Sequence, residues 1–406
     1  MITADLQIHS RYAQACSKQT NIENLEKYAR IKGINLLSTA DFTHPLWRKE
    51  LDEKLTEDEN GILWTKSKFP FLWGTEISLM YKQGGKGRRI HNLIFSPNKE
   101  VTDQITEALG KKGRLDYDGR PIFGFTSIEL IDMVRGISND IEIIPAHAWT
   151  PWFSIFGSKS GFDSIKECFE EKSKHIHAIE TGLSSDPEMN WRLSQLDNIN
   201  LVSFSDAHSF WPWRLGREAT LFNTKLKYKE IINAIRTGEG LNSTIEVDPN
   251  YGKYHYTGHR NCNVHLNPVA SKKTKGICPI CKKPLTIGVA DRIEELADRP
   301  EGYKPKNART FKKLIPLHEI IAYNYKLSQL TSKKVWETYN KLINQFESEL
   351  NIMLNVEEEK LRKIIEDKLV DLIIKNRNQN LNIKPGYDGV YGEITEDKPQ
   401  KFLNEF

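Results

Sequence analysis

The chain has 406 residues, of which 38% are hydrophobic and 28% charged, with a formal net charge of +4 and a mean hydropathy of −0.55. No apolar run approaches the roughly 20 residues of a membrane span, and no basic region followed by an apolar one opens the chain. These numbers argue against a membrane protein. They predict a cytoplasmic, nucleoid-associated monomer that is long enough for two or three domains.

The first 240 residues alternate apolar β-type runs with helical stretches. Helices are expected at residues 21–32, with Thr20 as the N-cap, and at residues 127–137. Strands are expected at residues 2–9, 33–39, 69–79, 89–95, 141–145, 178–181 and 201–205. Such alternation predicts a parallel sheet. A closed α/β barrel fits better than an open sheet, because at least six strand ends must meet at one point.

Metal-seeking side chains lie in or after six of these strands. The six segments are Asp5-Leu6-Gln7-Ile8-His9, Asp41-Phe42-Thr43-His44, Gly74-Thr75-Glu76, His91, Pro145-Ala146-His147 and Ser205-Asp206-Ala207-His208. In extended chain, residues i and i+2 share a face, so Asp206 and His208 can reach one ion. Imidazole suits Zn²⁺ or Mn²⁺, whereas carboxylate suits Mn²⁺ or Mg²⁺ and can bridge two ions. The pattern therefore predicts a multinuclear centre that activates water for phosphoester hydrolysis.

A Cys/His cluster interrupts the alternation after residue 240. His259-x2-Cys262 and Cys278-x2-Cys281 have the spacing of a structural zinc site, with His265 as a spare ligand and unliganded thiols as the alternative. Residues 253–313 hold 14 Lys or Arg against 5 Asp or Glu, whereas residues 1–240 hold 31 against 32. The local excess predicts a polyanionic partner, and Lys272, Lys273 and Lys275 are candidates for contacting a DNA backbone.

The C-terminal part is helical in pattern. Long amphipathic helices are expected at residues 333–347 and 356–375. The predicted domains are residues 1–240 for catalysis, 241–304 for zinc, 305–395 as a helical DNA-binding domain, and 396–406 as a flexible tail. Within the tail, residues 400–406 place Gln400, Leu403 and Phe406 as in a sliding-clamp peptide, although a plain disordered end explains them equally well.

In order and spacing, the six segments resemble the polymerase and histidinol phosphatase (PHP) domain. That resemblance implies a distorted (β/α)7 barrel with three metal ions. By position, the family's ligands fall on Gln7, His9, Asp41, His44, Glu76, His91, His147, Asp206 and His208. Gln7 departs from the pattern, which has His there, and a glutamine oxygen is a poorer ligand for Zn²⁺. Either this chain works with fewer tightly held ions or it has been altered to trap substrate.

Longer stretches are similar to the endonuclease Q family of DNA repair enzymes. They are residues 4–12, 145–152, 203–209, 214–218, 291–298 and 391–394. The resemblance implies recognition of uracil, hypoxanthine (inosine), xanthine or abasic sites in double- or single-stranded DNA. It also implies hydrolysis of the phosphodiester 5′ to the lesion, leaving 3′-hydroxyl and 5′-phosphate ends.

The chemistry assigns roles to several of these residues. Glu76 can bridge two ions, His9 and Asp206 would complete one ion, His91 and His147 a second, and His44 with His208 a third, with Asp41 nearby. Asp206, Glu76 and His9 are the expected catalytic residues, with Zn²⁺, Mg²⁺ or Mn²⁺ as cofactors. Trp149, Trp152, Phe153, Trp211 and Trp213 could wall a pocket for an extruded base, and Arg88, Arg89, Arg214 and Arg217 could bind phosphates. Core packing and solvated surface are the alternatives for these groups.

Two other functions remain open from the sequence. A small-molecule phosphomonoesterase would use the same metal centre, but it leaves the basic zinc segment unexplained. A non-catalytic DNA-binding protein is favoured only by Gln7, and the retention of Glu76, Asp206 and His208 weighs against it.

Overall fold

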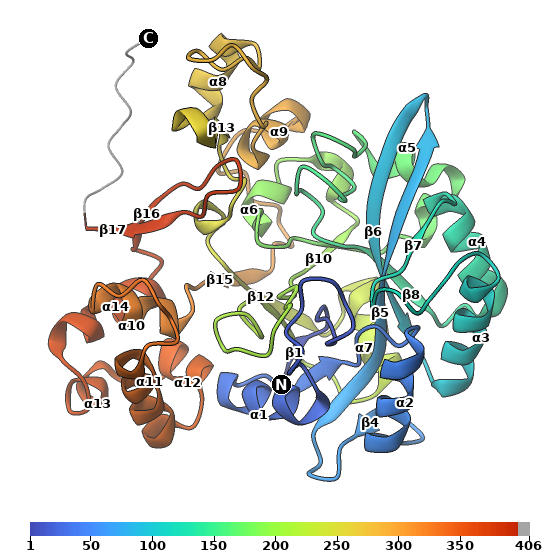
Figure 1. Cartoon of the computed structure of the whole chain (residues 1–406), viewed down its shortest axis with the longest axis horizontal. Helices are drawn as coiled ribbons and strands as arrows, with labels where there is room; N and C mark the ends of the chain where they lie inside the picture. The colour runs from blue at the N-terminus through green and yellow to red at the C-terminus, as the bar shows by residue number, and fades with distance from the viewer. Residues whose placement is uncertain (397–406) are drawn as a thin grey trace.

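The computed structural model describes residues 1–396, which form a mixed α/β fold around a large sheet (Figure 1). The main path of this sheet runs β15-β12-β11-β1-β2-β5-β4-β3, and β6, β7 and β8 join it through β5 and β6. Its strands are β1 (Ile2–Asp5), β2 (Leu36–Ser38), β3 (Thr56–Glu57), β4 (Leu63–Trp64), β5 (Pro70–Gln83), β6 (Lys86–Ser96), β7 (Ile122–Phe123), β8 (Glu142–Pro145), β11 (Ala219–Phe222), β12 (Leu241–Glu246) and β15 (Thr310–Lys313).

The sheet is only partly parallel, in contrast to the expectation from the sequence. Strands β1, β2 and β5 pair in parallel, whereas β5 and β6 form a long antiparallel hairpin. Gly84 and Gly85 form its two-residue turn with φ values of 59° and 76°. Two consecutive positive φ angles are those of the tight hairpin turn that glycine allows, so the chain reverses at once without a crossover helix.

Closure of the sheet into a barrel is not made by continuous strand pairing within residues 1–396. Strands β9 (Ala178–Glu180) and β10 (Asn200–Val202) form a parallel pair of their own after β8. A bridge between Ile8 and Ala207 brings the segment after β10 against the segment after β1. The seven-stranded barrel therefore stays a prediction, although its ligand-bearing strand ends lie side by side.

Helices cover this sheet and build the C-terminal part. Their bounds are α1 (Ile22–Lys32), α2 (Pro45–Lys54), α3 (Lys99–Gly110), α4 (Ser127–Ile137), α5 (Ile165–Phe169), α6 (Pro187–Asn190), α7 (Tyr228–Thr237), α8 (Pro268–Thr274), α9 (Val289–Leu296), α10 (Leu317–Asn324), α11 (Lys333–Phe346), α12 (Glu349–Leu354), α13 (Glu358–Arg362) and α14 (Asp367–Arg377). The N-cap of α1 is Asn21, not Thr20, because the Asn21 side chain accepts the backbone N–H of Asn24 at 2.9 Å.

The expected continuous helix over residues 356–375 is wrong. The chain forms α13, turns, and starts again as α14. Ile364 and Ile365 occupy the turn, and both of their N–H groups bond to the Leu361 carbonyl. The break divides the predicted helix into two shorter ones.

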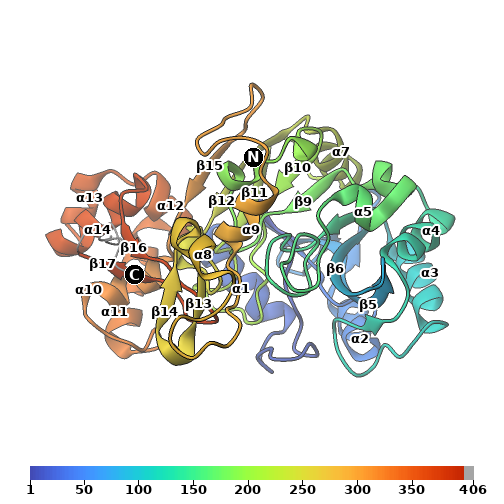
Figure 2. The same ribbon diagram turned by 90° about the horizontal axis from the view of Figure 1, so that it is seen from above.

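The C-terminal helices α10–α14 gather at one end of the molecule, opposite α3 and α4 (Figures 1 and 2). A buried ion pair joins the two parts, because Lys32 Nζ of α1 lies 2.6 Å from Glu349 Oε1 of α12. Next to it, Trp211 stacks on Trp213 and both rings meet Trp336 of α11. A buried pair and an aromatic cluster of this kind fix the helices against the sheet-bearing part.

In residues 1–396 no helix is both long and apolar enough to cross a membrane. The sliding-clamp motif at Gln400 to Phe406 lies outside the described residues.

Candidate metal centre

The structure brings the nine candidate ligands together at one end of the strands. Gln7 and His9 follow β1, Asp41 and His44 follow β2, Glu76 lies in β5, His91 in β6, His147 follows β8, and Asp206 and His208 follow β10. In the β5–β6 ladder His91 pairs with Ser78, which places His91 diagonal to Glu76 on the same face. Seven of the nine side chains are buried, and Asp206 and His208 are half-buried.

Glu76 is the centre of this arrangement. Its Oε1 lies 2.6 Å from His91 Nδ1 and 3.5 Å from His147 Nε2, while its Oε2 lies 3.0 Å from His9 Nε2. Gln7 donates a hydrogen bond from Nε2 to the same Oε2 at 2.8 Å. Both carboxylate oxygens thus face different groups of donors, which is the geometry of a bridging ligand.

His9 connects Glu76 to the second group. His9 Nε2 lies 3.2 Å from Asp206 Oδ1, and the His9 and His208 rings are 4.6 Å apart. The ligand atoms of His9, Asp206 and His208 all lie within 4.8 Å of one another, as do those of Glu76, His91 and His147. The structure thus groups His208 with His9 and Asp206, in contrast to the pairing with His44 predicted from the sequence.

Asp41 and His44 lie beside these two groups. Asp41 Oδ1 is 3.2 Å from His9 Nδ1, and its Oδ2 accepts the Ser10 N–H at 2.7 Å. This contact orients the His9 ring and leaves His9 Nε2 facing the centre. His44 stacks on Tyr12 with 4.5 Å between ring centroids, and its buried Nδ1 has no hydrogen-bond partner among the described residues.

The backbone is strained where ligands enter the centre. Asp41, His147 and Asp206 have φ values of 36°, 31° and 48°, a region that costs a residue with a side chain of order 1–3 kcal/mol. A Cβ on Gly182 would lie 2.7 Å from His147 Cβ, so only glycine fits next to this ligand. Strain of this kind persists only where surrounding contacts hold it, and it is typical of functional sites.

The charge balance of the centre fits bound cations. Burial opposes a charge on His9, but Asp41, Asp206 and Glu76 outweigh it and hold the pKa of His9 well above its ordinary value. Burial also favours neutral Glu76, yet Arg120 and the neighbouring imidazoles hold the pKa of Glu76 well below its ordinary value. Gln7 Oε1, His9 Nε2 and Asp206 Oδ1 are buried without a hydrogen-bond partner in residues 1–396. Buried oxygen and nitrogen atoms that make no hydrogen bond, set among carboxylates and imidazoles, are suitable ligands for divalent metal ions.

The candidates for DNA contact differ in how far they are exposed. Trp149 is 1% exposed, donates a hydrogen bond to Asn190 and packs on Phe156, and Arg88 is 5% exposed and bonds within the protein to Gly161 and Glu167. Core packing, the alternative given from the sequence, therefore explains Trp149 and Arg88 better than DNA contact does. Arg89, Lys272, Lys273 and Lys275 are exposed, whereas Trp152, Phe153, Trp211 and Arg214 are half-buried, and Trp213 and Arg217 are buried.

Phe153 is the aromatic residue of this set that reaches the metal centre. Its ring centroid lies 4.7 Å from that of His91, and the guanidinium of the exposed Arg89 lies over the Phe153 ring, 5.6 Å from its centroid. Phe153 itself has a φ of 61°, so the loop is bent to present it there. An aromatic ring and a cation next to the ligands suit contact with a nucleotide.

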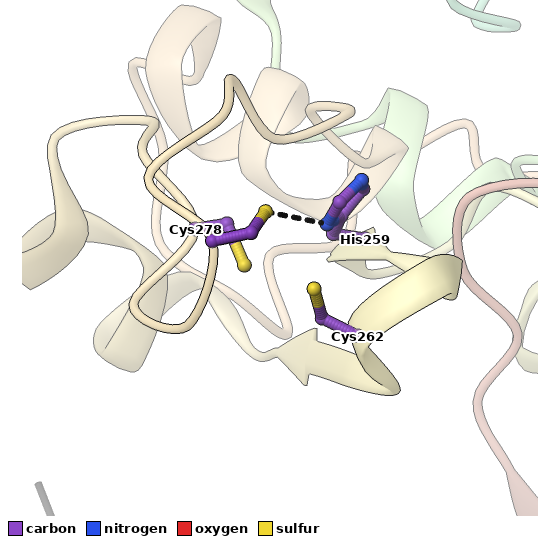
Figure 3. Close-up of side chains that lie close together, drawn as sticks. His259, Cys262 and Cys278 are labelled. Carbon is purple, nitrogen blue, oxygen red and sulfur yellow. Dashed lines mark hydrogen bonds between the residues drawn. The ribbon is translucent and has the colours of Figure 1, made fainter.

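The Cys/His cluster forms a compact module with β13 (Thr257–His259), β14 (Val264–Leu266) and α8. His259, Cys262 and Cys278 point toward one another (Figure 3), and with Cys281 their ligand atoms lie within 4.8 Å of one another. Burial opposes ionisation of Cys278, but the N–H groups of Cys281 and Ile280 and the His259 ring lower its pKa to about 6. Three thiols and one imidazole in this geometry suit a closed tetrahedral zinc site, in which His265 has no required role.

Two residues at the centre were missed from the sequence. Arg120 donates a hydrogen bond to Glu76, and Glu180 of β9 accepts the backbone N–H of His147. Glu180 is fully buried, and burial next to Asp206, Glu218 and Glu76 raises its pKa well above the ordinary value. The Asp118-Gly119-Arg120-Pro121 segment has the composition of a turn, which was a local signal for Arg120. Nothing in its spacing indicates that Arg120 faces Glu76 of β5.

Comparison with known proteins finds solved structures that share the fold along the whole chain. The lesion-specific endonuclease PfuEndoQ from Pyrococcus furiosus superposes with a TM-score of 0.87 at 31% identity, over 100% of this chain and 97% of that one. An endonuclease Q in complex with a 27-mer duplex with an abasic lesion at the active site gives 0.87 at 32% identity, over 100% and 98%.

Relatives found by sequence are themselves uncharacterised. The protein MJ0043 of Methanocaldococcus jannaschii is 33% identical over 261 residues, which are 63% of this chain and 32% of that protein, so the match spans about a third of that relative. The protein YqxK of Bacillus subtilis is 29% identical over 373 residues, 89% of each chain. The family of the MJ0043 C-terminal domain matches residues 316–380.

A mixed α/β fold with this order of His, Asp and Glu residues defines a protein of the PHP class. Within that class, the full-length structural match at more than 30% identity shows that the chain belongs to the endonuclease Q family.

Proposed function

We propose that this protein is a DNA repair endonuclease that cuts the phosphodiester 5′ to deaminated bases and abasic sites. The observation that carries the proposal is the convergence of Glu76, His9 and Asp206 within 3.2 Å contacts, in a chain that superposes along its full length on an endonuclease Q with a lesion duplex. Uracil, hypoxanthine and xanthine are the deaminated bases proposed as substrates.

The residues of the centre divide into three groups of ligands in this proposal. His9, Asp206 and His208 would hold one ion, Glu76, His91 and His147 a second, and Asp41 with His44 a third, more weakly held one. Divalent ions bound there would activate water and neutralise the charge of the phosphodiester. Glu76 would connect two of the ions, and Asp206 would hold the attacking water through Oδ1, which faces His9 Nε2 at 3.2 Å but makes no hydrogen bond in residues 1–396.

Lesion recognition would use the rim of the centre. A base that pairs poorly leaves the duplex at a lower free-energy cost, which favours deaminated bases and abasic sites over normal pairs. Phe153, next to His91, would stack on the nucleotide, and Arg89 above it would contact a phosphate. The exposed lysines of the zinc module would bind the flanking duplex without reading its sequence.

The test uses end-labelled duplexes that contain one deoxyuridine, one deoxyinosine or one abasic site, with an undamaged duplex as the control. The protein is incubated with Mg²⁺ or Mn²⁺ in its native form and as Gln7→His. We expect a single nick 5′ to the lesion, and DNA ligase should reseal the deoxyuridine and deoxyinosine duplexes directly, because the nick has 3′-hydroxyl and 5′-phosphate ends. If neither form nicks any lesion duplex, the proposal is wrong.

Gln7 supports one competing function, a DNA-binding protein with an impaired centre. In that case the native chain binds lesion duplexes without nicking them, and Gln7→His nicks. A phosphomonoesterase would instead release phosphate from nitrophenyl phosphate and ignore the lesion duplexes.

A further inference from the structure

Arg120 reaches the metal centre from the loop between α3 and β7. Its Nη1 donates a hydrogen bond to Glu76 Oε1 at 3.3 Å, and its side chain is 21% exposed. Among residues 1–396 it is the one Lys or Arg whose side chain forms a hydrogen bond with a candidate ligand. The centre therefore has one permanent positive charge that is open to solvent on one side.

The backbone on both sides of Arg120 is fixed. The Gly119 N–H bonds to the Tyr12 carbonyl at 3.0 Å, and the Ser78 N–H of β5 bonds to the Pro121 carbonyl at 3.0 Å. The Arg120 N–H itself bonds to Asp118 Oδ1 at 3.0 Å. The direction in which Arg120 leaves the backbone is thus set by contacts with two ligand-bearing segments.

Glycine at position 119 brings this turn close to the ligands. A Cβ there would lie 2.3 Å from Asp41 Oδ2, so any other residue would push the turn away from the centre. The close approach of the turn and the position of Arg120 thus depend on the same local geometry.

The contact with Glu76 is weak for a charged pair. Charge-assisted N–H···O bonds are typically about 2.7–2.9 Å long, and this bond is longer. Divalent ions on the two Glu76 oxygens would make the surroundings of Glu76 positive and repel the guanidinium. A phosphodiester anion next to those ions is then the stronger partner for Arg120.

We propose that Arg120 binds the non-bridging oxygens of the scissile phosphate and stabilises the charge that these oxygens gain during hydrolysis. This inference rests on the proposed function. A water oxygen forms a bond to phosphorus, the bond from phosphorus to the 3′ oxygen breaks, and that oxygen leaves with a proton that water supplies. Arg120 keeps its protons throughout, and its fork of N–H donors fits two phosphate oxygens.

The test compares Arg120→Ala and Arg120→Lys with Arg114→Ala. Arg114 lies in the same loop, is exposed and pairs with Asp116, so it is a matched control. Single-turnover nicking at saturating duplex should fall about 10²- to 10³-fold in Arg120→Ala, and less in Arg120→Lys, because one preorganised donor group is lost. Guanidinium ion added to Arg120→Ala should restore part of the rate, which a purely structural role would not allow.

Two further measurements separate this inference from the proposed function. Metal content by mass spectrometry should be unchanged in Arg120→Ala, while the affinity of the metal-loaded protein for inorganic phosphate should fall about 10-fold, as for one lost charge-assisted contact. If Arg120→Ala binds phosphate more weakly but the native protein nicks no DNA, the proposed function is wrong, whereas Arg120 still binds phosphate at the centre. Unchanged phosphate affinity, an unchanged nicking rate or loss of metal in Arg120→Ala would overturn the inference.

Discussion

Gln7 donates its side-chain amide to Glu76 Oε2 over 2.8 Å, at the carboxylate that connects the two groups of candidate ligands. The other end of the same amide, Oε1, is buried and has no hydrogen-bond partner in residues 1–396. The amide thus occupies one lone pair of the Glu76 carboxylate and offers only a weak oxygen ligand in return.

Replacing Gln7 by His should add metal to the centre. Imidazole offers a stronger ligand for Zn²⁺ and Mn²⁺ than an amide oxygen, and the change frees Glu76 Oε2. We expect about one more bound ion per chain, measured by plasma mass spectrometry after dialysis against the metal. Gln19→His is the control, because Gln19 is exposed. An unchanged metal content in Gln7→His would contradict this role of the amide.

Asp206→Asn should stop cleavage but preserve DNA binding. The carboxylate is lost next to His9, whereas asparagine tolerates the φ of 48° at this position and keeps the fold. Nicking should fall at least about 10³-fold, the equivalent of about 4 kcal/mol of transition-state stabilisation. Filter binding to a lesion duplex in Ca²⁺ should change little. Asp103→Asn, on an exposed site, is the control, and nicking by Asp206→Asn at the native rate would refute the assignment.

The ligand segments could be predicted because they depend on local signals. Each of the seven expected strands is present. Polar side chains that directly follow a buried strand lie at its C-terminal end, where those of neighbouring strands meet. The hairpin turn was also visible in the sequence, because Gly84-Gly85 between two β-type runs indicates an antiparallel pair, but a parallel sheet was predicted instead. Arg120 and Lys32 could not be assigned, because their partners Glu76 and Glu349 are set by tertiary packing. No periodicity connects residues that lie 44 and 317 positions apart.

Lys32→Met should destabilise the contact between α1 and the C-terminal helices. Lys32 and Glu349 are both 2% exposed or less, so removing Lys32 leaves the buried Glu349 carboxylate with hydrogen bonds from the Leu317 N–H and the Tyr339 hydroxyl but no counter-charge, at a cost of about 3–5 kcal/mol. The free energy of unfolding, measured in denaturant, should fall by that amount, and Lys32→Met with Glu349→Gln should recover much of it. Lys27→Met, on the exposed side of α1, is the control. A loss in Lys32→Met no larger than in the control would show that the pair does not hold the two parts together.

Cys278→Ser should remove one zinc ion and weaken binding to any duplex, damaged or not. In the predicted zinc site the Cys278 thiolate would be one of four ligands, and without an ion there the basic module should lose its fold. Zinc released per chain, measured with a colorimetric chelator, should drop by about one equivalent. Cys168→Ser, a buried cysteine outside the module, should keep the native zinc content. Native zinc content in Cys278→Ser would rule out this site.

Glu246 should make stability depend on pH. It is fully buried, and burial raises its pKa from 4.5 to about 7, although the Thr244, Ser203 and Thr181 hydroxyls oppose the shift. Because the folded state binds the proton more tightly, this contribution is present below pH 4.5 and is lost as pH rises through 7. The shift in pKa corresponds to about 3 kcal/mol in the free energy of unfolding.

Glu246→Gln keeps the shape and hydrogen bonds without titrating, so its free energy of unfolding should fall less than that of the native protein between pH 4.5 and 8. The exposed Glu239→Gln should follow the native profile. Parallel profiles for Glu246→Gln and the native protein would show that Glu246 is not the titrating group.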